Sequence, residues 1–144
     1  MNATHWTQHL ALLLTRLTFG GLMLVNHGMG KMERLLEGGT IRFADPLGIG
    51  AELSLALAAG AETVCALLLA LGLFTRLNAI PLMVTMVVAA FMIHSGDQLP
   101  DKEPALMYLA AYAALFLMGG GDWSLQALFS KWMPKNSFVR FLLS

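Results

Sequence analysis

The chain has 144 residues, of which 57% are hydrophobic and 12% charged, and its nine basic residues balance nine acidic ones. So apolar a composition lies outside the range of ordinary soluble domains and predicts an integral membrane protein. A neutral chain without a basic cluster gives no support to a nucleic-acid partner, and a single cysteine, Cys65, excludes an intramolecular disulfide and a C-x-x-C redox motif.

Four apolar segments are expected to cross the bilayer as helices, because a hydrocarbon core of about 30 Å needs about 20 helical residues. They cover residues 6–25, 53–74, 77–93 and 105–118. The second and third have no polar stripe that could face water, which excludes a soluble bundle. We therefore predict an all-α fold, an integral membrane four-helix bundle of up-down topology, with residues 1–144 forming a single domain.

Two segments outside these helices are predicted to lie at the membrane surface. Residues 28–50 contain many glycines and one proline, and we expect a loop cap between the first two helices that includes a short amphipathic turn. Residues 122–144 mix aromatic and basic side chains, which is typical of an amphipathic tail at an anionic interface. An even number of spans places both termini, with Trp6, Trp123 and Trp132, on one side.

The orientation in the membrane is not decided by counting charges. Four Lys or Arg residues fall outside the spans on each side, so the positive-inside rule gives a tie. The compact basic and aromatic tail favours cytoplasmic termini.

Two ionisable residues lie near the middle of predicted spans. Arg16 is about ten residues from either end of the first span, and Glu62 is about as far from the start of the second. Because an unpaired ion at that depth costs several kcal/mol, we expect an Arg16–Glu62 ion pair between antiparallel helices. Such a pair has two interpretations that the sequence leaves open: it fixes helix register only, or it belongs to a functional site.

A polar track is predicted to lead from Arg16 to the membrane rim. Eleven α-helical residues return His27 to within about 20° of Arg16 on the same helix face. Polar residues from the other segments are expected at the same rim, and the whole set forms a predicted pocket mouth. The candidate ligand-binding residues are Arg16, His27, Lys31, Glu62, His94 and Glu103, with Glu52 and Asp97 nearby. The alternative is that these are simply the polar ends of membrane helices.

A metal or haem centre is not indicated. His27 and His94 could in principle form a bis-histidine site, but every ligand would come from a different segment and no H-x-x-E or H-E-x-x-H spacing is present. Motifs for nucleotide binding and serine hydrolysis are also absent from the sequence. We expect no covalently bound cofactor.

Several short motifs resemble the DoxX/DoxD-like family of small inner-membrane proteins. The H-G-x-x-K motif corresponds to His27, Gly28 and Lys31, the buried glutamate to Glu62, and a G-L-x-T-R turn to residues 72–76. The family's closing S-L-D reads S-L-Q here, at residues 124–126. The resemblance implies a four-helix protein of the bacterial inner membrane, often linked to quinone redox processes or to oxidative-stress complexes.

Three functions remain open from the sequence. The first is a membrane subunit that binds a quinone or another small amphiphile and supports an oxidoreductase partner protein, since no residue of this chain carries electrons alone. The second is a non-enzymatic scaffold or assembly factor, and the third is a small-solute transporter formed by an oligomer. A homodimer is compatible with each of them, and the lipid bilayer is a partner in all three.

Overall fold

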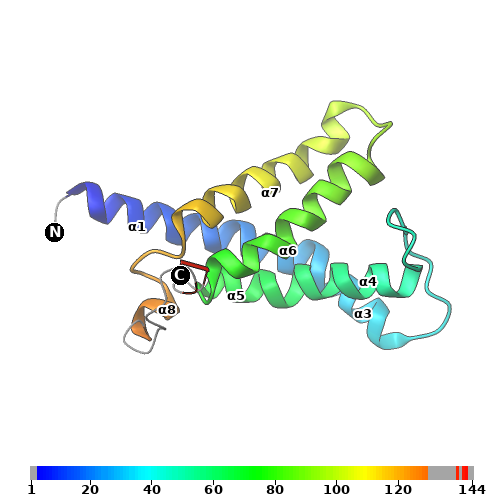
Figure 1. The fold of residues 1–144 in the computed structure, drawn as a ribbon, viewed down its shortest axis with the longest axis horizontal. Helices are drawn as coiled ribbons and strands as arrows, with labels where there is room; N and C mark the ends of the chain where they lie inside the picture. The colour runs from blue at the N-terminus through cyan, green and yellow to red at the C-terminus, as the bar shows by residue number, and fades with distance from the viewer. Residues whose placement is uncertain (1–2, 130–138, 140, 143–144) are drawn as a thin grey trace.

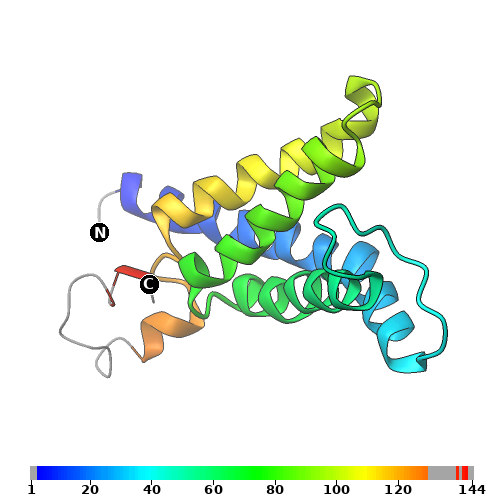
Figure 2. The ribbon, with the colours of Figure 1, turned by 45° about the vertical axis from the view of Figure 1, so that its right-hand side comes forward.

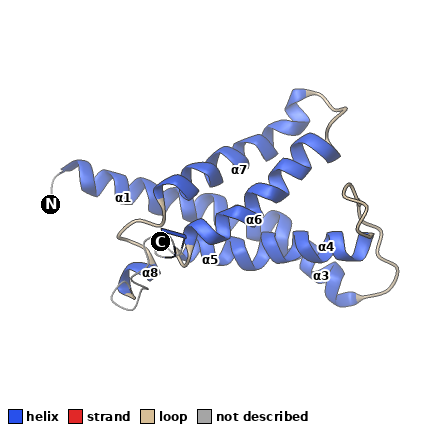
Figure 3. Ribbon diagram, viewed as in Figure 1, coloured by secondary structure: helices blue, strands red, loops and turns tan. Residues whose placement is uncertain are grey.

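The structure, a computed structural model, describes residues 3–129, 139 and 141–142. Every regular element in these residues is helical, and Figure 3 shows no strand among them. The expected all-α fold is therefore confirmed.

The first helix is much longer than the sequence predicted. It runs without interruption from Ala3 to Glu37 and contains two π-helical turns, which have wider hydrogen-bonded rings than the α-helix. Its parts are α1 (Ala3–Thr15), η1 (Arg16–Gly20), α2 (Gly21–Met23), η2 (Leu24–Gly28) and α3 (Met29–Glu37).

The predicted loop cap is therefore shorter than expected, because residues 28–37 continue the helix. Gly28 does not end the helix: its backbone is helical and packs directly against the second helix. The connection that remains begins at Gly38, whose φ of 69° is a conformation that favours glycine.

The second and third helices follow as an antiparallel pair joined by a tight turn. Gly72 ends α5 in the left-handed conformation that commonly terminates helices, and α6 begins at Thr75. Pro81 lies inside α6, and the hydroxyl of Thr85 donates to its carbonyl. The elements are α4 (Ala51–Gly60), η3 (Ala61–Cys65), α5 (Ala66–Leu71), α6 (Thr75–Val88) and η4 (Ala89–Ile93).

The fourth long helix is α7 (Leu99–Met118), and a short helix, α8 (Leu125–Leu128), follows it. Only part of the predicted surface tail can be compared with the structure, because residues 130–138, 140 and 143–144 lie outside the described residues. Trp132 belongs to that part. Trp6 and Trp123 do lie together as predicted, with ring centroids 5.7 Å apart in an edge-to-face arrangement.

The helices form two hairpins that diverge toward one end of the molecule. In Figures 1 and 2, α6 and α7 run side by side and separate from α3 and α4 toward the right of the view. We call that side, with α3, residues 38–50 and the α6–α7 turn, the loop end. The opposite side, with α1, the α5–α6 turn and residues 119–129, is the terminal end.

Small residues set the spacing between the first two helices. A Cβ atom on Gly20 would lie 2.9 Å from both the carbonyl oxygen of Ala66 and the Cβ of Ala70. Larger side chains would push the helices apart, as is general for helices packed in lipid. The buried apolar core draws on all four long helices and includes Leu12, Met23, Leu69, Ala79, Leu82, Met86, Tyr112 and Leu115.

Residues 38–50 are held by one carboxylate. Asp45 accepts hydrogen bonds from the backbone of Gly50 (2.8 Å) and Ile49 (3.0 Å) and from the hydroxyl of Ser54 (2.8 Å). These bonds, led by the one from Gly50, lower the pKa of Asp45 below its usual value because they favour the charged form. The connection thus has a defined local structure although it lies on the surface.

Three of the helices in the described part of the chain are long and apolar enough to cross a membrane. They span His5–Glu37, Ala51–Leu71 and Thr75–Ile93. These correspond to the first three predicted spans. The fourth predicted span, residues 105–118, forms the C-terminal part of α7, and its crossing of the bilayer remains a prediction.

Candidate functional site

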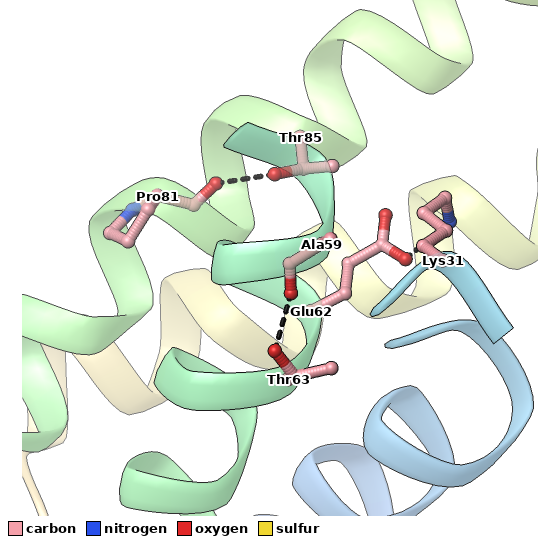
Figure 4. A network of polar contacts seen from close by, with 6 residues as sticks. All are labelled: Lys31, Ala59, Glu62, Thr63, Pro81 and Thr85. Carbon is pink, nitrogen blue, oxygen red and sulfur yellow. Dashed lines mark hydrogen bonds and ion pairs between the residues drawn. The ribbon is translucent and has the colours of Figure 1, made fainter. Parts of the chain in front are cut away.

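A buried ion pair joins the first two helices near the loop end. The Lys31 ammonium on α3 bonds the Glu62 carboxylate, and Figure 4 shows the Glu62 side chain pointing from η3 toward Lys31. The Glu62 side chain is 4% exposed and that of Lys31 is 23% exposed. Because a lone carboxylate at this burial would be costly, Lys31 supplies its charge compensation.

The local sequence explains why the two helices meet so closely here. A Cβ on Gly28 would collide with the backbone carbonyl of Glu62 and would lie 2.9 Å from the Thr63 methyl. Glycine therefore brings the first helix against the π turn that carries Glu62. The Thr63 hydroxyl donates back to the carbonyl of Ala59, so it is satisfied within its own helix (Figure 4).

The predicted Arg16–Glu62 pair is wrong. Arg16 lies at the terminal end, where its Nη2 donates to the carbonyl of Trp123 at 2.9 Å, whereas Glu62 is bonded to Lys31. The packing register explains the error, because Gly28 meets Glu62 while Gly20 meets residues 66 and 70. The sequence-based prediction ended the first helix at Val25. It therefore placed Arg16 next to Glu62, whereas the helix continues and brings Lys31 to that position.

The predicted polar track along the first helix holds only in part. Arg16, Gly20 and Met23 are buried, as a single inward face requires, but His27 is exposed. Arg16 and Gly20 belong to the π turn η1, and His27 belongs to the π turn η2. Each π turn changes the angle between successive side chains from that of a regular α-helix. The sequence-based rotation of 100° per residue therefore does not apply across this stretch.

His27 nevertheless belongs to the surroundings of the ion pair. It precedes Lys31 by four residues and therefore lies about one helical turn away along the first helix. Its ring meets that of Tyr108 on α7 edge-to-face, with centroids 5.8 Å apart. One turn further along α7, the Tyr112 hydroxyl donates to the Phe19 carbonyl at 3.2 Å.

The two tyrosines were missed by sequence reasoning. The available signal was their spacing: Tyr108 and Tyr112 stand four residues apart in an otherwise apolar segment, so they share one helix face. We refer to His27, Lys31, Glu62 and Tyr108 as the polar cluster. It combines an ammonium, a carboxylate, an imidazole and a phenol, all of which can donate or accept protons or hydrogen bonds.

The remaining predicted rim residues are at the loop end but do not join the polar cluster through any bond in the described contacts. His94 bonds Asp97 within its own turn, with Nδ1 and Oδ2 2.7 Å apart. Glu103 is exposed near the start of α7, and Glu52 is exposed in the first turn of α4. Figures 1 and 2 show the α6–α7 turn swung away from α3, which separates these helix ends.

An open hollow of about 610 Å³ borders α3. It is lined by Met29, Met32, Glu33, Leu36, Glu37 and Thr63. At 100° per residue, Met29 and Glu33 lie about 160° from Lys31 around the axis of the same helix. The hollow thus opens mainly on the side of α3 away from Lys31, and Thr63, the neighbour of Glu62, forms part of its lining.

A metal centre has no support in the geometry of the described residues. Within residues 3–129, 139 and 141–142, no three His, Cys, Asp or Glu side chains converge closely enough to hold a metal ion. Cys65 is a free, half-buried thiol.

Several apolar helices of membrane-crossing length, with an ion pair buried between two of them, define a multi-pass helical membrane protein. Residues 11–95 match the family model DoxX, a range that includes both members of the ion pair. The chain is also 33% identical over 106 residues to a Haemophilus influenzae protein described as uncharacterized, and the match covers 70% of each chain. The chain belongs to the DoxX family. No solved structure matches it.

Proposed function

We propose that this DoxX-family protein binds a quinone or a similar small amphiphile at the polar cluster and supports an oxidoreductase partner in the bacterial inner membrane. The observation that carries the proposal is the buried Lys31–Glu62 pair with an exposed imidazole one turn away. Intramembrane ionisable groups are functional candidates by default because their burial is costly.

The chemistry of the cluster supports this class of ligand. A quinone needs hydrogen-bond or proton donors at its two oxygens and apolar surface around its ring. His27 and Lys31 supply donors, the Tyr108 ring supplies an aromatic wall, and Glu62 holds Lys31 in place. In this proposal the partner supplies the electrons, because side chains such as these bind and protonate a quinone but do not carry electrons themselves.

The position of the cluster supports entry from the lipid. The two helical hairpins diverge toward the loop end, and the cluster draws its residues from both of them: α3, η2 and η3 on one side and α7 on the other (Figures 1 and 2). An amphiphile dissolved in the bilayer would reach His27 without crossing water, because His27 is exposed on a membrane-crossing helix.

Ligand binding can be tested with decylubiquinone and menadione. The purified protein is heated in mild-detergent micelles with and without each quinone, and a bound quinone is expected to raise Tm because it binds only the folded state. His27→Ala should weaken binding about tenfold, the loss expected when one good hydrogen bond is removed. The matched control is Asn26→Ala, an exposed neighbour on the same helix turn.

Two results would contradict the proposal. One is a wild-type Tm that neither quinone changes at saturating concentration. The other is an equal response of His27→Ala and the wild type, which would place any quinone elsewhere. Either result would favour a scaffold function for the protein.

The proposed orientation, with cytoplasmic termini, has its own test. A fluorescent-protein fusion at the C-terminus should fluoresce in bacterial cells, and an alkaline phosphatase fusion at the same position should be inactive. The reverse pattern would place the termini on the outer side.

A further inference from the structure

Arg16 is a buried cation whose charge no described residue compensates. Its side chain has no exposed surface. Nη2 donates to the Trp123 carbonyl, but Nε and Nη1 have no hydrogen-bond partner. An unmade hydrogen bond from a buried donor is costly, and more so from a charged group. Asp122, the residue before Trp123, does not pair with Arg16. Its Oδ2 lies 3.0 Å from Nε2 of His9, and its side chain is 79% exposed.

A second arginine at the terminal end, Arg76, has hydrogen-bond partners for its guanidinium, so missing partners are not common to both arginines there. Arg76 donates from Nε to the carbonyl of Phe116 at 2.9 Å and from Nη2 to that of Leu117 at 3.1 Å. Its Nη1 donates to the carbonyl of Phe141 at 3.0 Å, and its guanidinium lies 4.0 Å from the ring of the same residue. All three guanidinium nitrogens of Arg76 thus donate hydrogen bonds within the protein, whereas two nitrogens of Arg16 have no acceptor.

A second buried polar group without a hydrogen-bond partner lies close to Arg16. The hydroxyl of Thr75, at the start of α6, is buried and has no hydrogen-bond partner. A Cβ on Gly120 would lie 2.7 Å from this hydroxyl and 3.2 Å from the Cβ of Ser124. A Cβ on Gly72 would collide with Nη1 of Arg16 and would lie 2.6 Å from the same Ser124 atom. Ser124 therefore adjoins both unsatisfied groups.

We propose that Arg16 and Thr75 form a binding site for a phosphate group, supplied by a phospholipid headgroup or by free phosphate. A phosphate oxygen accepts hydrogen bonds and carries the negative charge that the guanidinium lacks. The site lies at the N-terminal end of α6, where the helix dipole also favours an anion. Gly120 brings the backbone close over Thr75, since a Cβ there would lie 2.7 Å from the hydroxyl, so this glycine segment must move for a phosphate to enter.

The surroundings place the site where phosphate groups occur in a membrane. Trp6 and Trp123 meet edge-to-face at this end, and tryptophan is enriched at headgroup depth. In the structure, the Trp123 carbonyl takes one donor of Arg16. An incoming phosphate oxygen competes for that donor, so residues 119–126 shift when the phosphate binds. Trp123 lies in the moving part, so its edge-to-face contact with Trp6 reports the change.

Tryptophan fluorescence of the full chain provides the measurement. Trp132→Phe removes the third tryptophan, and the delipidated protein in uncharged detergent is titrated with inorganic phosphate against sodium chloride of equal ionic strength. A saturating change with phosphate alone is expected. This proposal does not depend on quinone binding, and the assay contains no quinone.

The source of the phosphate is distinguished by reconstitution. In phosphatidylglycerol nanodiscs, a lipid-headgroup site gives the shifted spectrum at once and free phosphate adds nothing. In galactolipid nanodiscs, which contain no phosphate, the shifted spectrum appears only after inorganic phosphate is added. A site for free phosphate alone responds to added phosphate in both kinds of disc.

Variants test which side chains are responsible. Thr75→Val, which keeps the shape of the side chain, should weaken phosphate binding about tenfold, and Arg16→Met should abolish it. Circular dichroism and gel filtration confirm folding, and Thr75→Val still decides the question if Arg16→Met does not fold. Arg42→Met, which alters an exposed cation at the loop end, is the control.

The proposal is overturned if phosphate produces no change beyond that of chloride in any of these environments. It is also overturned if folded Thr75→Val and Arg16→Met respond like the wild type, or if Arg42→Met abolishes the response.

Discussion

The two ends of the molecule treat a buried charge in opposite ways. At the loop end, Glu62 is neutralised by Lys31, and glycine at position 28 allows the helices to approach closely enough for the pair to form. At the terminal end, Arg16 is fully buried with a single carbonyl as its partner. The charge of Glu62 is thus compensated within the fold, whereas Arg16 keeps two donor nitrogens that a bound anion could use.

The largest expected effect comes from the helix contact at the loop end. Gly28→Val should prevent folding or destabilise the protein by more than about 3 kcal/mol, because its side chain would collide with the backbone of the second helix rather than with a movable side chain. The yield of monodisperse protein and its Tm measure the effect.

Gly30→Val is the matched control for this prediction. Gly30 lies on the same helix, and a Cβ there would meet nothing within 4 Å. Equal damage from both substitutions would mean that helix spacing is not the cause.

Breaking the ion pair should give the next largest effect, and an asymmetric one. Lys31→Met strands the Glu62 carboxylate and should cost about 3 kcal/mol of unfolding free energy, whereas Glu62→Leu should cost less because Lys31 is partly exposed and can reach water. The double variant should recover much of the loss.

Thermal unfolding in micelles of the four proteins, wild type, both single variants and the double variant, gives the coupling energy. A coupling energy near zero would show that the pair is not compensating the buried charge.

A smaller effect is expected from Arg16→Met in the absence of phosphate. The substitution removes a hydrogen bond to the Trp123 carbonyl but also removes an uncompensated buried charge, so stability should change by only about 1 kcal/mol. Chemical denaturation in phosphate-free buffer measures the change. A loss as large as that of Lys31→Met would remove the contrast between the two ends.

The smallest effect on global stability is expected in residues 38–50. Asp45→Asn should leave Tm almost unchanged but should speed chymotrypsin cleavage after Phe43 or Leu47, because the bonds from the backbone and Ser54 weaken. Since the pKa of Asp45 is lowered in the folded protein, its contribution is present above the ordinary pKa of aspartate and is lost as pH falls through the lowered one.

Asp101→Asn, an exposed acid at the start of α7, serves as the control for the cleavage assay. Unchanged cleavage of Asp45→Asn would mean that other contacts hold this connection.

The sequence predicted the all-α fold and three of the membrane-crossing helices because long apolar segments admit few alternatives. Of the residues that the sequence singled out, Arg16 and Glu62 are both buried, and Lys31 is bonded to Glu62. The pairing failed because register depends on where small residues let helices touch, as at Gly20 and Gly28, and composition does not reveal this.

The second reason why sequence-based prediction failed is that the rotation from one side chain to the next is not constant along these helices. The π turns that include Arg16, His27 and Glu62 break the regular rotation on which face assignments depend. Such turns are frequent at functional sites, and nothing in the local residue pattern predicted them. The exposure of His27 and the contact of Lys31 with Glu62 therefore required coordinates.

The length of the first helix has a consequence for how the protein sits in lipid. A membrane-crossing helix of 33 residues measures about 50 Å, while the hydrocarbon layer is about 30 Å thick. Tilt alone would have to exceed about 50° to hide it, whereas transmembrane helices reach about 40°. One end must therefore leave the hydrocarbon layer, and the charged turn at Glu33, Arg34 and Glu37 suits the headgroup region. The hydrophobic mismatch thus favours a position of the α3 tip outside the hydrocarbon layer, among the polar headgroups.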